Sequence, residues 1–209
     1  MYLVGFDPGG RKAFGWAVIA YATSTPELVA SGTCSGAGAA FDAARSACGC
    51  ETPSAVGTDA PLYWVMGGDR KADREVRRCL REAIGARAAS GTVGAINSLS
   101  GACLVEGVQV TRLARLHWPH ARITEAHPKA LMRVDKGTRD FASRFFNQGS
   151  SDHERDAAVA AYAAHKMLIG EPGWINLVEL DPEPFFPGGS ELEYWFPSTA
   201  VTSIAPPTF

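Results

Sequence analysis

The chain begins with the stretch Tyr2-Leu3-Val4-Gly5-Phe6-Asp7-Pro8-Gly9-Gly10, an apolar run that ends in a carboxylate and a glycine-rich turn. Such a run bounded by turn residues predicts a β-strand. A carboxylate at the tip of a buried strand is costly unless it is paired or binds a cation. The stretch therefore predicts a buried first strand that carries Asp7 to a polar site.

The same arrangement of an acid after a short apolar run recurs along the chain. Asp59 follows residues 55–58, Glu125 follows residues 122–124, and Asp156 lies in the segment His153-Glu154-Arg155-Asp156-Ala157. Several such carboxylates brought together would form an oxygen-rich site of the kind that binds Mg²⁺ or Mn²⁺. The pattern favours a metal-dependent phosphoryl-transfer enzyme, in particular a nuclease.

Hydrophobic periodicity and turn residues predict the order of the elements. Strands are expected at 2–6, 15–21, 28–33, 55–58 and 123–126, and helices at 37–47, 73–84, before about 116, from Pro128 onward and at 152–168. This order predicts a mixed α/β fold with a five-stranded sheet: three antiparallel strands, then strands that alternate with helices. Helices are expected to flank the sheet.

The C-terminal residues differ in composition from the rest. Residues 170–209 hold seven of the 13 prolines and six acids, and no lysine or arginine. We therefore expect a domain over residues 1–169, followed by an irregular acidic extension that packs on the domain or is partly disordered.

The charge distribution predicts a polyanionic partner. The net charge is −2, but residues 70–144 carry 15 of the 20 basic residues and 7 of the 22 acids, a local balance of 15 − 7 = +8. A nucleic acid, DNA or RNA, is the partner that such a segment favours, although solvated helix faces explain the charge count about equally well. The expected phosphate contacts are Arg70, Lys71, Arg74, Arg78, Lys129, Arg133 and Lys136.

The candidate site residues have a catalytic interpretation and a plainer structural one. Hydrolysis with two divalent ions requires carboxylates that hold both ions, and Asp7 is the expected bridging ligand. His153 and Asp156 are three residues apart on one predicted helix face, so the imidazole serves as a ligand or moves a proton. By contrast, Asp59 alone is more typical of a turn, His153 alone of a surface position, and Glu125 has the alternative of pairing with an arginine.

The motifs resemble those of known nucleases. Gly5-Phe6-Asp7-Pro8-Gly9 and His153-Glu154-Arg155-Asp156-Ala157 are similar to the first and last motifs of RNase H-like nucleases, and RuvC-type Holliday-junction resolvases are close by these motifs. Thr58-Asp59-Ala60-Pro61-Leu62 and Thr124-Glu125-Ala126-His127-Pro128 are more similar to a family of unknown function (domain of unknown function 429) that is described as predicted RNase H-like nucleases.

This resemblance implies an RNase H-like domain that binds Mg²⁺ or Mn²⁺, two ions in all, through Asp7, Asp59, His153 and Asp156. Glu125 is an accessory catalytic residue in this interpretation. A homodimer is implied by the resolvases, which cut junctions as dimers.

Other functions are consistent with the same residues. A non-catalytic nucleic-acid- or protein-binding module on the same scaffold is the main alternative to a nuclease. An ATP-handling protein of the actin and sugar-kinase fold is disfavoured, because the chain lacks a second glycine-rich phosphate loop. No apolar stretch reaches the length of a membrane span and the N-terminus does not resemble a signal peptide, so a cytoplasmic protein without membrane contact is expected.

Overall fold

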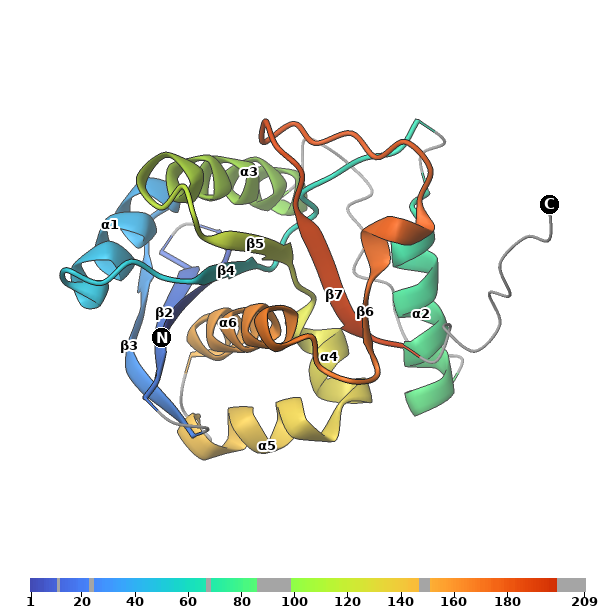
Figure 1. Ribbon diagram of the computed structural model, residues 1–209, viewed down its shortest axis with the longest axis horizontal. Coiled ribbons are helices and arrows are strands. Elements are labelled where there is room, and N and C mark those ends of the chain that lie inside the picture. Colours follow the sequence, from blue (N-terminus) through green and yellow to red (C-terminus); the bar gives the residue numbers. More distant parts are fainter. Residues whose placement is uncertain (11, 23–24, 67–68, 86–98, 147–150, 199–209) are drawn as a thin grey trace.

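A computed structural model describes residues 1–10, 12–22, 25–66, 69–85, 99–146 and 151–198. They form a mixed α/β fold in which helices cover both faces of a sheet (Figure 1). The strands are β1 (Tyr2–Asp7), β2 (Phe14–Tyr21), β3 (Pro26–Cys34), β4 (Ala55–Thr58), β5 (Arg122–Glu125), β6 (Trp174–Asn176) and β7 (Glu193–Pro197). The helices are α1 (Ala37–Cys48), α2 (Lys71–Ile84), α3 (Leu99–His117), α4 (Pro128–Val134), α5 (Lys136–Phe145), α6 (Asp152–Ile169) and the 3-10 turn η1 (Leu177–Leu180).

The sheet is antiparallel at its start and parallel at its centre. Its strand order is β3-β2-β1-β4-β5-β7-β6. The β1–β2 and β2–β3 pairs are antiparallel, as the sequence predicted, whereas β4 lies parallel to β1, and β5 parallel to β4. Because the carboxyl ends of parallel strands meet at one edge of a sheet, Asp7, Asp59 and Glu125 all reach the same edge.

The prediction of five strands was wrong, because the C-terminal segment contributes two more. β7 pairs parallel to β5, and β6 pairs antiparallel to β7, so the segment that the sequence predicted to be irregular contains two short strands. The reason is the alternation inside β7, where Tyr194 and Phe196 are buried between half-buried neighbours. The prolines of this segment lie mostly outside the strands.

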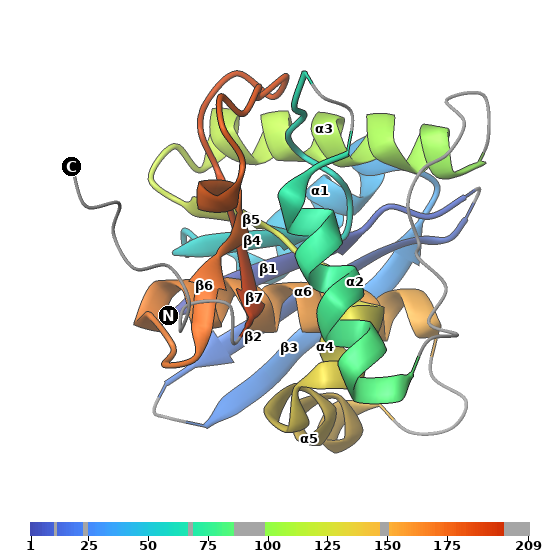
Figure 2. The same cartoon turned by 90° about the vertical axis from the view of Figure 1, so that its right-hand side faces the viewer.

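The helices divide between the two faces of the sheet. Figures 1 and 2 show α1 and α3 on one face, and α6 on the other with α4 and α5 beyond it. In Figure 2, α2 stands in front of the sheet, where it contacts α4 and η1. Among the described residues, no helix combines the length and the apolar character needed to cross a bilayer.

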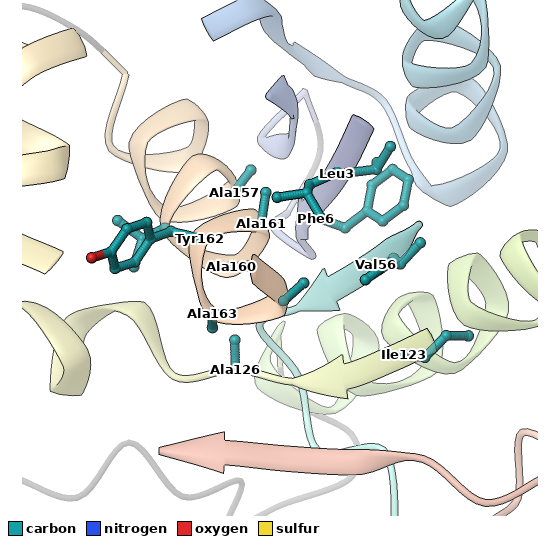
Figure 3. Packing of buried hydrophobic residues seen from close by; sticks show 14 of the residues in the cluster. Leu3, Phe6, Val56, Ile123, Ala126, Ala157, Ala160, Ala161, Tyr162 and Ala163 are labelled. Atoms are coloured by element: carbon teal, nitrogen blue, oxygen red, sulfur yellow. The ribbon is translucent and has the colours of Figure 1, made fainter. Parts of the chain in front are cut away.

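Helix α6 lies unusually close to the sheet because small residues meet on both sides. Its alanines face β1 and β4 (Figure 3), and Ala157, Ala160 and Ala161 are fully buried. A Cβ atom built on Gly5 would lie 1.8 Å from the carbonyl oxygen of Ala157, and one on Gly57 would lie 1.9 Å from that of Ala160. Gly5 and Gly57 are paired neighbours in the sheet, so together they form the surface on which α6 rests.

Candidate active site

The first two turns of α6 bring two predicted site residues to the sheet edge where β1 and β4 end. Asp7 is the last residue of β1, and Asp59 follows β4 with its N–H donating to the carbonyl of Phe6 at 2.9 Å. Asp7 lies two residues after Gly5 in β1, so side-chain alternation turns its carboxylate toward α6. Asp59 follows the last residue of β4, and its carboxylate lies within electrostatic reach of Asp7 and Asp156. His153 and Asp156 project from the start of that helix.

A short hydrogen bond joins the strand to the helix. Nδ1 of His153 and Oδ2 of Asp7 are 2.6 Å apart, and Asp7 is 7 % exposed. The contact depends on Gly15, since a Cβ atom there would lie 2.1 Å from the carbonyl oxygen of His153. Gly15 pairs with Asp7 in the β1–β2 register. The local sequence therefore positions the imidazole beside the carboxylate.

Asp156 is the most deeply buried acid of the group. It is 2 % exposed, and Nη2 of Arg155 donates to its Oδ1 at 2.9 Å. Nζ of Lys129, at the start of α4, lies 4.0 Å from its other oxygen. The Lys129 side chain is 71 % exposed, so its ammonium group contacts both solvent and the edge of the site.

Burial raises the pKa of all three carboxylates, and neighbouring carboxylate charges add to this for Asp7 and Asp59. Burial, opposed by the His153 hydrogen bond and reinforced by the charge of Asp156, raises the pKa of Asp7 to about 6. Burial and the charges of Asp7 and Asp156 hold the pKa of Asp59 well above its usual range. Burial also raises the pKa of Asp156, although Arg155 opposes this. Three acids thus stand within electrostatic reach of one another.

The site has the oxygen donors that a hard divalent cation prefers, but among the described side chains they are not assembled around a common point. Within the described part of the chain, the carboxylate of Asp59 makes no hydrogen bond or ion pair, so both its oxygens are available as ligands. The described residues contain no group of three or more acidic, histidine or cysteine side chains already close enough together to hold a metal. Asp7 and Asp156 instead contact His153, Arg155 and Lys129. Ligation would require a rearrangement of these side chains.

The raised pKa of Asp7 predicts an unusual pH dependence of stability. Because this pKa is about 6 in the folded protein and 3.8 for an unperturbed aspartic acid, the folded state holds the proton more tightly. The contribution of Asp7 to stability is therefore complete below about pH 4 and lost as pH rises through about 6. We expect the unfolding free energy of the metal-free protein to fall over this window relative to that of Asp7→Asn.

Urea denaturation of both proteins at a series of pH values measures this difference. A difference between the two proteins that stays constant from pH 4 to pH 6.5 would contradict the pKa assignment. Asp7→Asn does not titrate at residue 7 but keeps the other carboxylates. It therefore serves as the control for their ionisation in the wild type.

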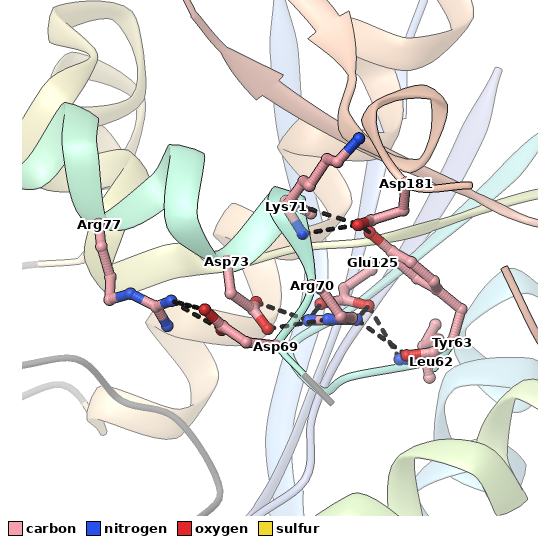
Figure 4. A network of polar contacts seen from close by, with 10 residues as sticks. Leu62, Tyr63, Asp69, Arg70, Lys71, Asp73, Arg77, Glu125 and Asp181 are labelled. Carbon is pink, nitrogen blue, oxygen red and sulfur yellow. Dashed lines mark hydrogen bonds and ion pairs between the residues drawn. The ribbon is translucent and has the colours of Figure 1, made fainter. Parts of the chain in front are cut away.

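Glu125 does not join this group, although its strand ends at the same edge. It pairs with Thr58 in the β4–β5 register, whereas Thr124 pairs with Gly57. Its side chain therefore points to the sheet face opposite α6, because alternate residues of a strand face opposite ways. Nη1 and Nη2 of Arg70 donate to its two oxygens at 2.8 and 2.7 Å (Figure 4). Of the two sequence interpretations, pairing with an arginine describes this arrangement.

The predicted phosphate contacts on α2, and Arg70 just before it, are largely paired with acids. Arg70 is 5 % exposed, so its assignment to a nucleic-acid-binding surface was wrong: the guanidinium lies in the interior against Glu125 and Asp73. Arg74 pairs with Asp69 at 3.2 Å. Arg78 pairs with Glu75 and Glu82. Lys71 is exposed at the start of the helix.

The basic residues of α4 and α5 lie on the surface. Lys129, Arg133 and Lys136 are all exposed, and Lys136 pairs with Asp140 at 2.5 Å. Lys129 and Arg133 are one helical turn apart, and Lys129 reaches Asp156. Of the predicted phosphate contacts, the α4 group is therefore the one adjacent to the carboxylates.

Two residues at the site were not singled out from the sequence. Arg155 lies between His153 and Asp156 and bridges Asp152 and Asp156, with Nη1 donating to Asp152 at 2.7 Å. Its position one residue before Asp156 was the available signal. The other is Cys103 of α3, whose pKa is raised by burial and by the charges of Asp7 and Asp59. No sequence pattern indicated Cys103, because only the packing of α3 brings it near.

One comparison with known proteins finds a match. The model of a family described as "Protein of unknown function (DUF429)" matches residues 5–140, a range that includes Asp7, Asp59 and Glu125 and ends before α6. No curated protein and no solved structure matches the chain.

Proposed function

Because the chain belongs to the DUF429 family, a family of unknown function, we propose its function from the site itself: a divalent-metal-dependent nuclease that hydrolyses phosphodiester bonds. The observation that supports this most is the meeting of Asp7, Asp59 and Asp156 at one sheet edge, where each has a raised pKa. Buried acids whose pKa values are raised by burial and by neighbouring charges are typical of functional sites. The resemblance to RNase H-like and RuvC-type nucleases is part of the same proposal.

The roles of the side chains follow from their surroundings. Asp7 is the shared ligand, because it is the most rigidly held, in a strand paired on both sides. Asp59 and Asp156 complete the oxygen ligands, and Mg²⁺ or Mn²⁺, two ions in all, would supply charge stabilisation for the attacking and leaving oxygens. His153, which already bonds Asp7, ligates or accepts a proton from the attacking water.

The substrate is a nucleic acid held through its backbone. Lys129 and Arg133 present positive charge on the surface of α4 beside the carboxylates, and Lys136 continues this surface at the start of α5. Contacts of this type position a strand without reading its bases. Binding should therefore weaken steeply as salt is raised.

A non-catalytic binding module is the second candidate, and one observation favours it. Arg155 and Lys129 already neutralise part of the charge of Asp156, as expected of a scaffold that needs no metal. The two candidates differ in their response to divalent cations, which stabilise the folded state only when they bind it.

We expect Mn²⁺ at about 100 times its dissociation constant to raise the melting temperature by about 5–10 °C, since the binding contributes about 2.7 kcal/mol. Thermal unfolding with and without Mn²⁺ measures the shift, and Asp59→Asn should abolish it. Asp42→Asn removes an exposed acid of α1 and should keep the full shift. A wild-type protein that shows no shift with either Mn²⁺ or Mg²⁺ would favour the binding module.

A further inference from the structure

The segment that follows Asp59 is held at residues 62–63 by the buried ion pair of Arg70 and Glu125, on the sheet face opposite α6 (Figure 4). Arg70 uses all five of its N–H donors. Nε and Nη2 donate to Asp73 at 2.9 and 2.7 Å, Nη1 and Nη2 donate to Glu125 at 2.8 and 2.7 Å, and Nη1 also donates to the carbonyl of Tyr63 at 3.1 Å. The guanidinium also lies 4.5 Å from the centroid of the Tyr63 ring.

Glu125 completes the attachment from the sheet side. Its Oε2 accepts a hydrogen bond from the backbone N–H of Leu62 at 2.9 Å, in addition to the bonds from Arg70. Leu62 lies three residues after Asp59 and is 1 % exposed. The Arg70–Glu125 pair therefore fixes the chain at Leu62 and Tyr63, just beyond the carboxylate that has no side-chain partner in the described residues.

We propose that Glu125, together with Arg70, is a positioning residue for Asp59: it orients a metal-binding carboxylate without touching the metal. The inference rests on the proposed function, because it assigns Asp59 a ligand role. On its upstream side Asp59 is anchored by its N–H bond to Phe6, and on its downstream side the nearest side-chain anchor among the described residues is the Glu125 bond to Leu62. Outer-shell partners that hydrogen-bond a metal ligand directly change metal affinity by about 10–100-fold when removed, and we take the lower end of this range for Glu125, which acts through the backbone at Leu62.

The test is Glu125→Asp, which keeps the charge but shortens the side chain by one methylene. The shorter carboxylate cannot reach Arg70 and Leu62 together, so Asp59 loses its downstream anchor. We expect the Mn²⁺ affinity, measured by titration calorimetry on the folded full chain, to fall about tenfold or more. Amide hydrogen exchange should show faster exchange at Leu62 even without metal. A folded Glu125→Asp protein with wild-type affinity and wild-type exchange at Leu62 would overturn the proposal.

Glu125→Gln separates position from charge. Its amide oxygen keeps the length needed to accept from Leu62, but the negative charge is lost. If Glu125 acts through position, Glu125→Asp weakens Mn²⁺ binding more than Glu125→Gln does. Because the NH₂ group of the glutamine cannot accept from Arg70, exchange at Leu62 shows whether the anchor itself is kept. Weaker Mn²⁺ binding in Glu125→Gln than in Glu125→Asp, with wild-type exchange at Leu62 in Glu125→Gln, would show that Glu125 acts through its charge and would contradict the positioning role. Both comparisons use samples that circular dichroism shows to be folded.

A second control tests whether a loss of stability elsewhere in the fold also weakens Mn²⁺ binding. Asp135 caps α5, where its Oδ2 accepts from the backbone N–H and the hydroxyl of Thr138 at 2.6 and 2.7 Å, away from the segment that follows Asp59. Asp135→Ala should lower stability by removing this cap but leave Mn²⁺ affinity unchanged. If the wild-type protein itself binds no Mn²⁺, the proposed function fails, and exchange at Leu62 in Glu125→Asp then decides the anchoring: faster exchange supports it, and unchanged exchange overturns it.

Discussion

Asp7→Asn is expected to lower metal-dependent cleavage by about 10³-fold or more and to leave the protein folded. The shared ligand contributes several kcal/mol of transition-state stabilisation in two-metal sites, and each ~1.4 kcal/mol corresponds to a factor of ten in rate. Asparagine keeps the size of the side chain and a contact with His153, so the β1–α6 junction should persist. Because Asp7 has a raised pKa, removing its titratable group should also not destabilise the metal-free fold near neutral pH.

The measurement is cleavage of a labelled panel in Mn²⁺ and in Mg²⁺. The panel contains linear, flapped and four-way DNA, an RNA–DNA hybrid and single strands, and it therefore also identifies the substrate class. Asp42→Asn, purified in the same way, controls for a contaminating nuclease, because Asp42 is an exposed acid of α1. Cleavage that survives unchanged in Asp7→Asn would exclude this carboxylate from the chemistry.

Gly57→Ala is expected to destabilise the fold by about 3 kcal/mol or more, the upper end of what a single added methyl group costs in a tightly packed interior. The new Cβ atom would lie 1.9 Å from the carbonyl oxygen and 2.5 Å from the carbonyl carbon of Ala160. Both are backbone atoms of α6, so a side-chain rotation cannot relieve the contact. The helix must move away from β4, and Asp156 and His153 move with it. The stabilisation by Mn²⁺ should therefore shrink as well.

Gly38→Ala is the matched control. This glycine lies on the exposed side of α1, and a Cβ atom there meets nothing within 4 Å. Alanine has the higher helix propensity, so the control should be neutral or slightly stabilising. Urea denaturation of both variants beside the wild type gives the two free energies. Equal denaturation midpoints for Gly57→Ala and the wild type would show that α6 does not rest on Gly57.

Local sequence patterns were sufficient to predict most of the helices and strands. The predicted helix at 37–47 is α1 (Ala37–Cys48), and the one at 152–168 is α6 (Asp152–Ile169). These segments combine apolar periodicity with turn or capping residues at their ends, and both signals are local. The predicted helix that ends near residue 116 is α3 (Leu99–His117), and residues 86–98 before it lie outside the described residues.

The C-terminal segment shows where local pattern was insufficient. Its prolines and acids suggested an irregular surface extension, but β7 completes the sheet beside β5. Asp181 of this segment accepts hydrogen bonds from the backbone N–H groups of Lys71 and Ala72 at the start of α2. An acid at that place is favourable because helix N-termini carry unsatisfied donors and a positive dipole. Composition cannot reveal this role, because the partner lies about 110 residues away.

The sequence by itself determined the strand that ends at Asp7, the helix that carries His153 and Asp156, and the small residues that let the two meet. The strand and the helix follow from periods of two and 3.6 residues, which the chain displays locally. Only the tertiary structure decided that Asp59 joins Asp7 and Asp156 while Glu125 does not. Strand register sets which face a strand-end side chain takes, and register is established between strands that are far apart in the chain. Glu125 pairs with Thr58 and not with Gly57, so its carboxylate faces Arg70 instead of Asp7 and Asp156.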